Sequence, residues 1–221
     1  MPEPPHPANA ASTTHLGKTY LDALKFLIGR IQETVRPYAK RLPEPVRMFI
    51  AGGTCLAFYV DRRISDDIDA TFSRKIALPE DLEVAYMGAD GKPRLLYFDY
   101  QYNDTLGLMH PNAHEDSTPF PLPGIDPKLV EIRLLSPLDL AVSKLSRYGQ
   151  TDQGDIHALA KAGLLTEKEL RARAEDALIG YIGNIDALKT TIGLACGLVR
   201  SARKKPVKGR RPQKPGPSNR R

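Results

Sequence analysis

Residues 46–72, VRMFIAGGTCLAFYVDRRISDDIDATF, decide the fold. Residues 46–51 are apolar and partly β-branched, which is typical of a buried strand, and Gly52-Gly53 ends that strand. Residues 54–60 then predict a short helix. In residues 68–72, apolar and polar side chains alternate, which predicts a second strand with two distinct faces. The order is strand, glycine turn, helix and strand.

Two aspartates follow the glycine turn at a spacing that suits a cation. Asp67 and Asp69 are alternate residues of the second predicted strand, so their carboxylates lie on one face, within reach of one divalent ion. Gly52-Gly53 allows close backbone approach, and a helix start at Thr54 offers N–H groups to phosphate. Taken alone, the glycine pair also fits a plain turn. The acidic pair, beside Asp66, also fits a solvated loop.

A third acid lies on a later predicted strand. Residues 94–102, RLLYFDYQY, predict a strand with Asp99 at its middle. Burying an acid there costs several kcal/mol unless it is paired or bound to metal, and the alternative is an exposed position on an edge strand. Residues 129–135, LVEIRLL, predict another strand with Glu131 on one face. The three aspartates Asp67, Asp69 and Asp99, on neighbouring predicted strands beside a glycine turn, form the arrangement that two-metal nucleotidyl transfer requires.

Helices are expected on both sides of this core. Residues 16–38 carry apolar side chains every three or four positions, which predicts an amphipathic helix. We expect a short helix over 79–87 and a surface loop over 103–127. Residues 136–199 predict further helices, begun by Ser136 as N-cap. The apolar stripe of the first helix consists of Tyr20, Leu24, Leu27, Ile31 and Val35.

Two shorter patterns refine the helices after Ser136. Residues 166–169, TEKE, form a capping box that predicts a helix start. The stripe of the last helix consists of Ile185, Leu188, Ile192 and Cys196.

The composition of the 221 residues excludes several classes of protein. With 41% hydrophobic and 26% charged residues, the chain is typical of a globular protein. Its longest apolar stretch is too short to span a membrane, and its N-terminus lacks the pattern of a secretory signal. We therefore expect a cytoplasmic protein that is not associated with a membrane. Cys55 and Cys196 are expected to be buried thiols rather than a disulfide, and the histidines and cysteines lack the spacing of a zinc site.

The positive net charge comes from one end of the chain. The protein carries +6 overall, but residues 200–221 hold ten Lys or Arg and no acid. The rest therefore has 22 basic against 26 acidic residues and a net charge of −4. This Pro- and Gly-rich tail is expected to be solvated and disordered, and to offer phosphates a sequence-independent anchor.

The string from Ala51 to Phe72 resembles the signature of the DNA polymerase β-like nucleotidyltransferase superfamily, because thirteen residues separate its Gly-Gly pair from Asp67-Ile68-Asp69. It is similar above all to the AbiEii-like branch, nucleotidyltransferases best known as toxins of toxin–antitoxin systems. The later segments YFDYQ, SPLDLAVSKL and DQGDI also resemble elements of that branch. The resemblance covers residues 47–160.

The resemblance implies a set of site residues. It implies that Asp67, Asp69 and Asp99 bind two Mg²⁺ ions and that the remaining residues bind the NTP. Outside the resemblance, Lys144 also fits a solvated helix lysine, and Asp155 also fits an acid at a helix start. Arg62 and Arg63 point either at phosphates or at water. The implied NTP-binding residues are Gly52, Gly53, Thr54, Arg63, Ser65, Lys144 and Asp155.

These patterns predict an α+β protein, with the mixed sheet and flanking helices of a nucleotidyltransferase followed by a helical C-terminal region. The predicted parts are a disordered leader (1–15), an N-terminal helix (16–44), the nucleotidyltransferase core (45–135), a helical region (136–200) and a disordered basic tail (201–221).

The expected reaction transfers a nucleoside monophosphate from an NTP to an acceptor hydroxyl. The resemblance implies RNA, including a tRNA end, as acceptor, and a cognate antitoxin as partner. One alternative keeps the enzyme but makes the acceptor a small molecule or a protein side chain. The other is a catalytically idle binding module that engages nucleic acid or an acidic partner through its basic tail.

Overall fold

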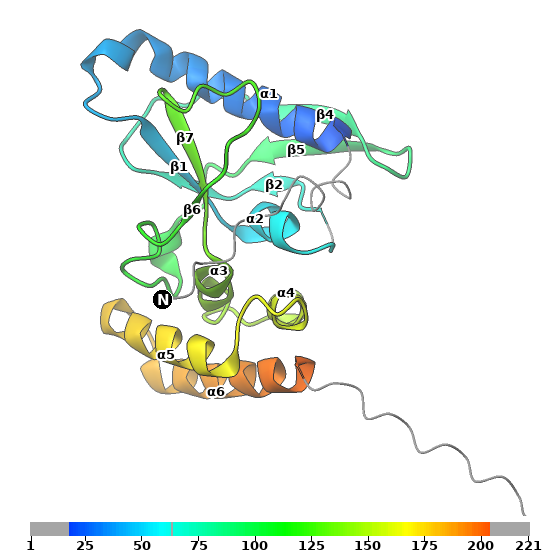
Figure 1. Cartoon of the computed structure of the whole chain (residues 1–221), viewed down its shortest axis with the longest axis vertical. Coiled ribbons are helices and arrows are strands. Elements are labelled where there is room, and N and C mark those ends of the chain that lie inside the picture. The colour runs from blue at the N-terminus through cyan, green and yellow to red at the C-terminus, as the bar shows by residue number, and fades with distance from the viewer. Residues whose placement is uncertain (1–17, 63, 204–221) are drawn as a thin grey trace, which may run out of the picture.

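The computed structural model describes residues 18–62 and 64–203 (Figure 1). Within these residues the fold is α+β, with six α-helices and two sheets. The predicted leader (1–15) and most of the basic tail (201–221) lie outside the described residues. The helices are α1 (Lys18–Val35), α2 (Gly52–Tyr59), α3 (Pro137–Ser143), α4 (Gln150–Lys161), α5 (Glu167–Ala177) and α6 (Ile185–Ala202), with 3₁₀ turns η2 (Arg36–Arg41), η3 (Asp104–Leu106) and η4 (Leu178–Gly180).

The strands form a four-stranded and a three-stranded sheet. They are β1 (Val46–Ile50), β2 (Asp67–Ile68), β3 (Ala70–Phe72), β4 (Glu83–Met87), β5 (Pro93–Phe98), β6 (Thr118–Pro119) and β7 (Val130–Leu134). The larger sheet has the order β3-β1-β7-β6, with β1 parallel to β7 and antiparallel to β3. The smaller has the order β2-β5-β4, with β2 parallel to β5. Both sheets are therefore mixed.

The predicted strand over 68–72 is divided between the two sheets. Ile68 accepts a backbone hydrogen bond from Asp99 N–H at 3.1 Å, whereas Asp69 accepts one from Ala51 N–H at 2.8 Å. Carbonyls of successive extended residues point to opposite sides, so this segment lies between β5 and β1. Asp69 occupies the junction, and the prediction of one uninterrupted strand is corrected at that residue.

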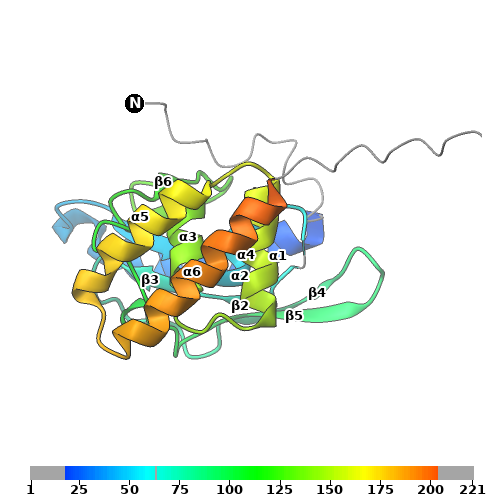
Figure 2. The same ribbon diagram turned by 90° about the horizontal axis from the view of Figure 1, so that it is seen from below.

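The helix predicted over 79–87 is wrong, because β4 occupies its second half. Val84 and Tyr86 lie on the more buried face of β4 and its other residues are exposed, which is the two-residue period of a strand. β4 pairs antiparallel with β5, and a turn at Gly88–Gly91 joins them. The turn end of the resulting hairpin projects beyond the other elements (Figures 1 and 2). Cross-strand pairing has outweighed local helix propensity here.

Asp99 lies just beyond a strand rather than at the middle of one. β5 ends at Phe98, and Asp99 is half-buried. Its Oδ1 accepts the backbone N–H of Gln101 at 2.8 Å, an Asx turn that takes the chain away from the sheet. The predicted loop over 103–127 likewise contains η3 and the short strand β6.

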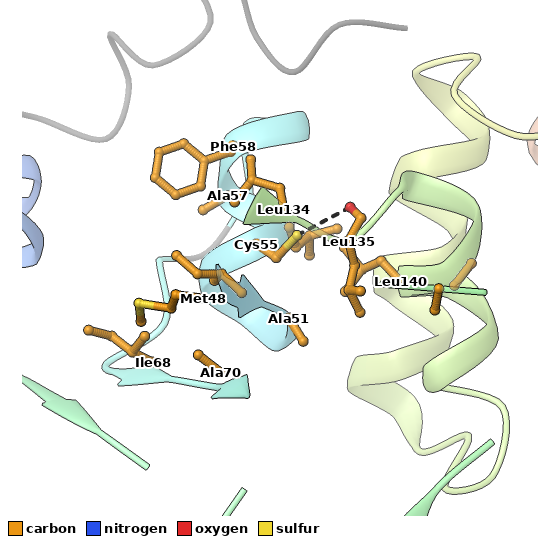
Figure 3. Close-up of a cluster of buried hydrophobic side chains, with 14 of the residues drawn as sticks. Met48, Ala51, Cys55, Ala57, Phe58, Ile68, Ala70, Leu134, Leu135 and Leu140 are labelled. Atoms are coloured by element: carbon orange, nitrogen blue, oxygen red, sulfur yellow. Dashed lines mark hydrogen bonds between the residues drawn. The ribbon is translucent and has the colours of Figure 1, made fainter. Parts of the chain in front are cut away.

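The first helix and the central core follow the sequence pattern. Every residue of the predicted α1 stripe is buried, and α1 packs against β4 and β5. Figure 3 shows α2 packed on β1, with Cys55 pointing toward the Leu135 carbonyl. Cys55 and Cys196 are buried free thiols, as predicted. The helix expected from Thr54 begins earlier, at Gly52.

The C-terminal helices form a separate layer below the sheets (Figure 1). Figure 2 shows α6 beside α4 and α5, which it contacts. Ser136 caps α3 by accepting Asp139 N–H at 3.0 Å, and Thr166 forms the predicted capping box with Glu169. Of the stripe expected on α6, Ile185 is 41% exposed, and the other three residues are buried.

Candidate functional site

Gly52 and Asp69 are in direct contact where β1 leads into α2. Gly52 has a φ of +58°, and a Cβ built on it would lie 1.7 Å from Asp69 Oδ2. The position therefore favours glycine twice, for the left-handed backbone and for the room that the carboxylate takes. The glycine turn seats the Asp69 side chain.

Asp67 is held by two hydroxyl groups. Ser65 Oγ donates to Asp67 Oδ1, and Thr54 Oγ1 donates to the Asp67 carbonyl at 2.6 Å. Thr54 is fully buried, and its hydroxyl also lies 3.1 Å from the hydroxyl of Tyr20. Thr54 therefore supports the strand behind Asp67 instead of presenting its hydroxyl to a ligand.

A pocket of about 380 Å³ opens beside these residues. Asp67 and Asp69 reach it from the β2–β3 junction, Asp99 from the end of β5, and Lys144 from the end of α3. Elements far apart in the sequence thus converge on it. The sequence-predicted site residues that line the pocket are Gly52, Gly53, Ser65, Asp67, Asp69, Asp99 and Lys144.

The three aspartates give one side of the pocket a concentrated negative charge. Burial, and then the charges of Asp67 and Asp99, raise the pKa of Asp69 to about 6, while Lys144 and Arg147 oppose the rise. A carboxylate whose pKa is raised by neighbouring carboxylates is one that a bound cation would favour in its charged form. We call Asp67, Asp69 and Asp99 the acidic side.

Lys144 and Arg147 also line the pocket, and we call them its basic side. Lys144 is 6% exposed, and its Nζ lies 2.8 Å from Asp155 Oδ2, an ion pair that lacks hydrogen-bond geometry. Arg147 donates two hydrogen bonds to Asp152, at 2.8 and 2.7 Å, and its side chain is 76% exposed. Both cations are therefore positioned by buried carboxylates on α4.

Asp155 lies behind the basic side and is fully buried. Besides Lys144, it accepts a hydrogen bond from Arg62 Nη1. A Cβ on Gly154 would lie 2.2 Å from Arg62 Nη2, so a glycine makes room for the guanidinium. Asp155 thus positions Lys144 and Arg62.

Two further sequence candidates lie elsewhere. Glu131, the alternative third acid, pairs on β7 with Arg133 at 2.6 Å and with Arg47 at 3.6 Å, and takes no part in the pocket lining. Arg63 lies outside the described residues.

The pocket also has lining residues that sequence reasoning missed. Most come from the predicted loop over 103–127, whose irregular sequence has no period to mark them. The polar pair Asn103-Asp104, directly after the strand predicted over 94–102, is the one local signal. The missed residues are Tyr102, Asn103, Asp104, Gly107, Leu108, Met109, Ser143 and Ser146.

The acidic side provides oxygen donors without a closed ligand cage. Among the residues 18–62 and 64–203, no group of three or more His, Cys, Asp or Glu side chains is arranged to hold a metal ion. Mg²⁺, however, is bound in nucleotide enzymes by one or two carboxylates, with water and substrate phosphates completing its octahedron. Asp67 and Asp69 fit that donor set.

Comparisons with family models, curated proteins and solved structures give no match for this chain. None of the helices in the described part of the chain is long and apolar enough to cross a membrane.

Proposed function

We propose that this protein is a metal-dependent nucleotidyltransferase that transfers a nucleoside monophosphate from an NTP to an acceptor hydroxyl. One observation carries the proposal: a single pocket is lined both by three aspartates, Asp67, Asp69 and Asp99, and by two cations, Lys144 and Arg147. Carboxylates bind cations and the basic side chains bind phosphate oxygens. A metal–triphosphate complex presents both kinds of group.

Each side of the pocket would bind one part of that complex. Asp67 and Asp69 would hold two Mg²⁺ ions, which when bound neutralise phosphate charge and make the acceptor hydroxyl more acidic. Asp99, oriented through Gln101 N–H, would complete the donor set. The backbone at Gly52-Gly53 would approach a phosphate.

The transfer balances without any further reactant. The acceptor oxygen forms a bond to the α-phosphorus, the bond from that phosphorus to the leaving oxygen breaks, and pyrophosphate departs. Asp99 takes the acceptor proton. Lys144 and Arg147 stabilise the charge that develops on the phosphate oxygens.

The proposed acceptor is RNA, including a tRNA end. This choice and the proposed cognate antitoxin rest on the resemblance of residues 47–160 to AbiEii-like toxins. A small-molecule or protein acceptor would leave the roles of the pocket residues unchanged.

The test is incubation with each α-labelled NTP, Mg²⁺ and total cellular RNA, followed by identification of the labelled molecule. We expect one RNA class to become labelled by the wild-type protein and not by Asp69→Asn. Asp66→Asn is the matched control, because Asp66 is an exposed neighbour that does not line the pocket. It should keep the wild-type rate.

Two results would contradict the proposal. One is no labelled product, in RNA or in protein and small-molecule fractions, with any NTP. The other is full activity of Asp69→Asn. The first would favour the idle binding module.

A further inference from the structure

A second pocket adjoins the first. It has a volume of about 310 Å³, and Asp104, Gly107 and Met109 line both pockets. Gly180 and Tyr181, which follow α5, also line it. The second pocket thus lies between the loop after β5 and the C-terminal helices, and its volume is within the range of small-molecule sites.

His114 is the best-oriented polar group in this second pocket. Its ring stacks on Phe49 of β1, with centroids 4.1 Å apart and planes 8° from parallel. Its Nε2 lies 2.9 Å from Asp104 Oδ2, and Asp104 also accepts the Thr71 hydroxyl at 3.2 Å. The hydrogen bond from His114 lowers the pKa of Asp104, so this carboxylate is charged. The imidazole is thereby fixed in plane and in rotation.

This arrangement leaves one His114 nitrogen for a ligand. A neutral ring that donates through Nε2 to Asp104 has its lone pair on Nδ1. Within the described residues no hydrogen bond occupies that Nδ1, and the side chain is 36% exposed. His110 differs, because its Nδ1 accepts Asn112 N–H at 3.1 Å and its Nε2 lies 2.7 Å from Asp176 Oδ2.

We infer that the second pocket is a nucleoside-binding subsite, with His114 Nδ1 accepting a hydrogen bond from the bound base. The inference rests on the proposed function. A nucleotide whose phosphates occupy the first pocket has its planar base and ribose next to them, and the second pocket is the first pocket's neighbour, since Asp104 and Gly107 line both. The wall residues His114 and Tyr181 offer aromatic surface to a planar group.

Gly180 permits a test that leaves the fold intact. Gly180 lines the second pocket, and a Cβ built on it meets nothing within 4 Å, so Gly180→Leu adds a bulky side chain at this lining position without a clash at Cβ. Gly193→Leu is the control, because Gly193 is exposed on α6 and a Cβ there also meets nothing within 4 Å. His114→Phe keeps an aromatic ring on Phe49 and removes Nδ1 together with the Nε2 contact to Asp104, and tripolyphosphate binding reports whether that second loss disturbs the first pocket.

The measurement is the Kd of each protein for three probes by calorimetry: an NTP, inorganic tripolyphosphate and a short single-stranded RNA with a free 3′-hydroxyl. We expect Gly180→Leu and His114→Phe to raise one nucleoside-containing Kd about tenfold and to leave the tripolyphosphate Kd unchanged. If the variants bind the NTP more weakly, the nucleoside in the second pocket belongs to the incoming nucleotide. If they bind the RNA more weakly, it belongs to the acceptor.

Two outcomes overturn the inference. One is unchanged binding of both NTP and RNA by both variants. The other is an equal loss for tripolyphosphate, which would mean that the substitutions disturb the first pocket. Failure of the proposed function is separate, because it appears as absent transfer by wild type whatever Gly180→Leu does to binding.

Discussion

The two sides of the main pocket are both built with aspartates, yet the charges of these aspartates are balanced in opposite ways. On the acidic side, burial and neighbouring carboxylates raise the pKa of Asp69 to about 6. On the basic side, burial alone would raise the pKa of Asp152, but hydrogen bonds from Arg147 and Gly149 outweigh it and lower that pKa. The same residue type is therefore destabilised in its charged form on one side and stabilised on the other.

The difference lies in the partners of each carboxylate. Asp152 and Asp155 are buried and paired with cations. In the part of the chain that the structure describes, no Lys, Arg or His forms a salt bridge with Asp67, Asp69 or Asp99. Carboxylates without a protein cation are available to a ligand, whereas the paired ones act as scaffold.

The largest effect is expected from removing the third acid. Asp99→Ala should lower the rate of labelled nucleotide transfer on the order of 1000-fold, because it removes a donor and the proton acceptor. Glu131→Ala, on β7 outside the pocket, should change the rate by less than about threefold. If Glu131→Ala lost most of its transfer rate while Asp99→Ala stayed active, the third acid would be Glu131 and the site would lie nearer β7.

On the basic side, loss of a carboxylate should destabilise the fold. Asp155→Asn leaves Lys144 and Arg62 without their buried partner, and we expect the free energy of unfolding in urea to fall by about 3 kcal/mol. Asp67→Asn is the counterpart on the acidic side and should keep or raise stability, since it relieves repulsion. Equal losses for the two variants would erase the distinction between ligand-binding and scaffold aspartates.

The acidic side was the more predictable half of the site. The Gly-Gly and DxD spacings are local, and the sequence identified Gly52, Asp67 and Asp69 directly. The contact between Gly52 and Asp69 was not predictable, because it depends on the chain changing sheets at Asp69. Asp99 lies beyond the strand at a turn where it accepts hydrogen bonds from Gln101 N–H and Tyr102 N–H, and a strand pattern does not reveal such a turn.

The fold was predictable where one period dominates. The stripe of α1 and the caps at Ser136 and Thr166 are strong local signals. The helix predicted over 79–87 is wrong because β4 has only five residues, of which two have side chains that are not exposed, and so short a strand shows little periodicity. This strand depends on its pairing with β5, which the local sequence does not reveal. Sequence reasoning also missed the hydrogen bond from the Thr54 hydroxyl to the Asp67 carbonyl. The expected contact of the N–H groups at this helix start with phosphate stays a prediction.

The contact of Gly52 with the acidic side should separate activity from stability. Gly52→Ala and Gly163→Ala both place a side chain at positive φ, +58° and +80°, and this backbone conformation alone should cost each variant about 1 kcal/mol of unfolding free energy. Gly52→Ala should lose more than that, because its Cβ would lie 1.7 Å from Asp69 Oδ2. Only at Gly52 would the methyl group displace Asp69, because the space at Gly163 is open. Transfer should therefore fall on the order of 100-fold in Gly52→Ala alone. Similar rates in both variants would show that the position of Asp69 is unimportant.

The smallest predicted effect is a change in the stability of the metal-free protein with pH. Between about pH 4 and 6, folded Asp69 holds a proton that the unfolded chain has lost, because its pKa rises from 3.8 to about 6 on folding. Metal-free protein should therefore lose about 1 to 2 kcal/mol of stability as pH rises through this window, after allowance for solvent screening at the open pocket. Above pH 6 the loss should level off.

Asp69→Asn and Asp152→Asn should change this profile in opposite senses. Asp69→Asn removes the loss between pH 4 and 6 and so stabilises the metal-free protein at pH 7. The lowered pKa of Asp152 contributes stability above the unfolded pKa that is lost as pH falls below about 4, so Asp152→Asn should flatten that acid limb and lower stability at pH 7. Urea unfolding from pH 3 to 8 measures both limbs, and adding Mg²⁺ at pH 7 should stabilise wild type more than Asp69→Asn. If Asp69→Asn kept the wild-type slope between pH 4 and 6, Asp69 would carry no excess negative charge to offer a cation.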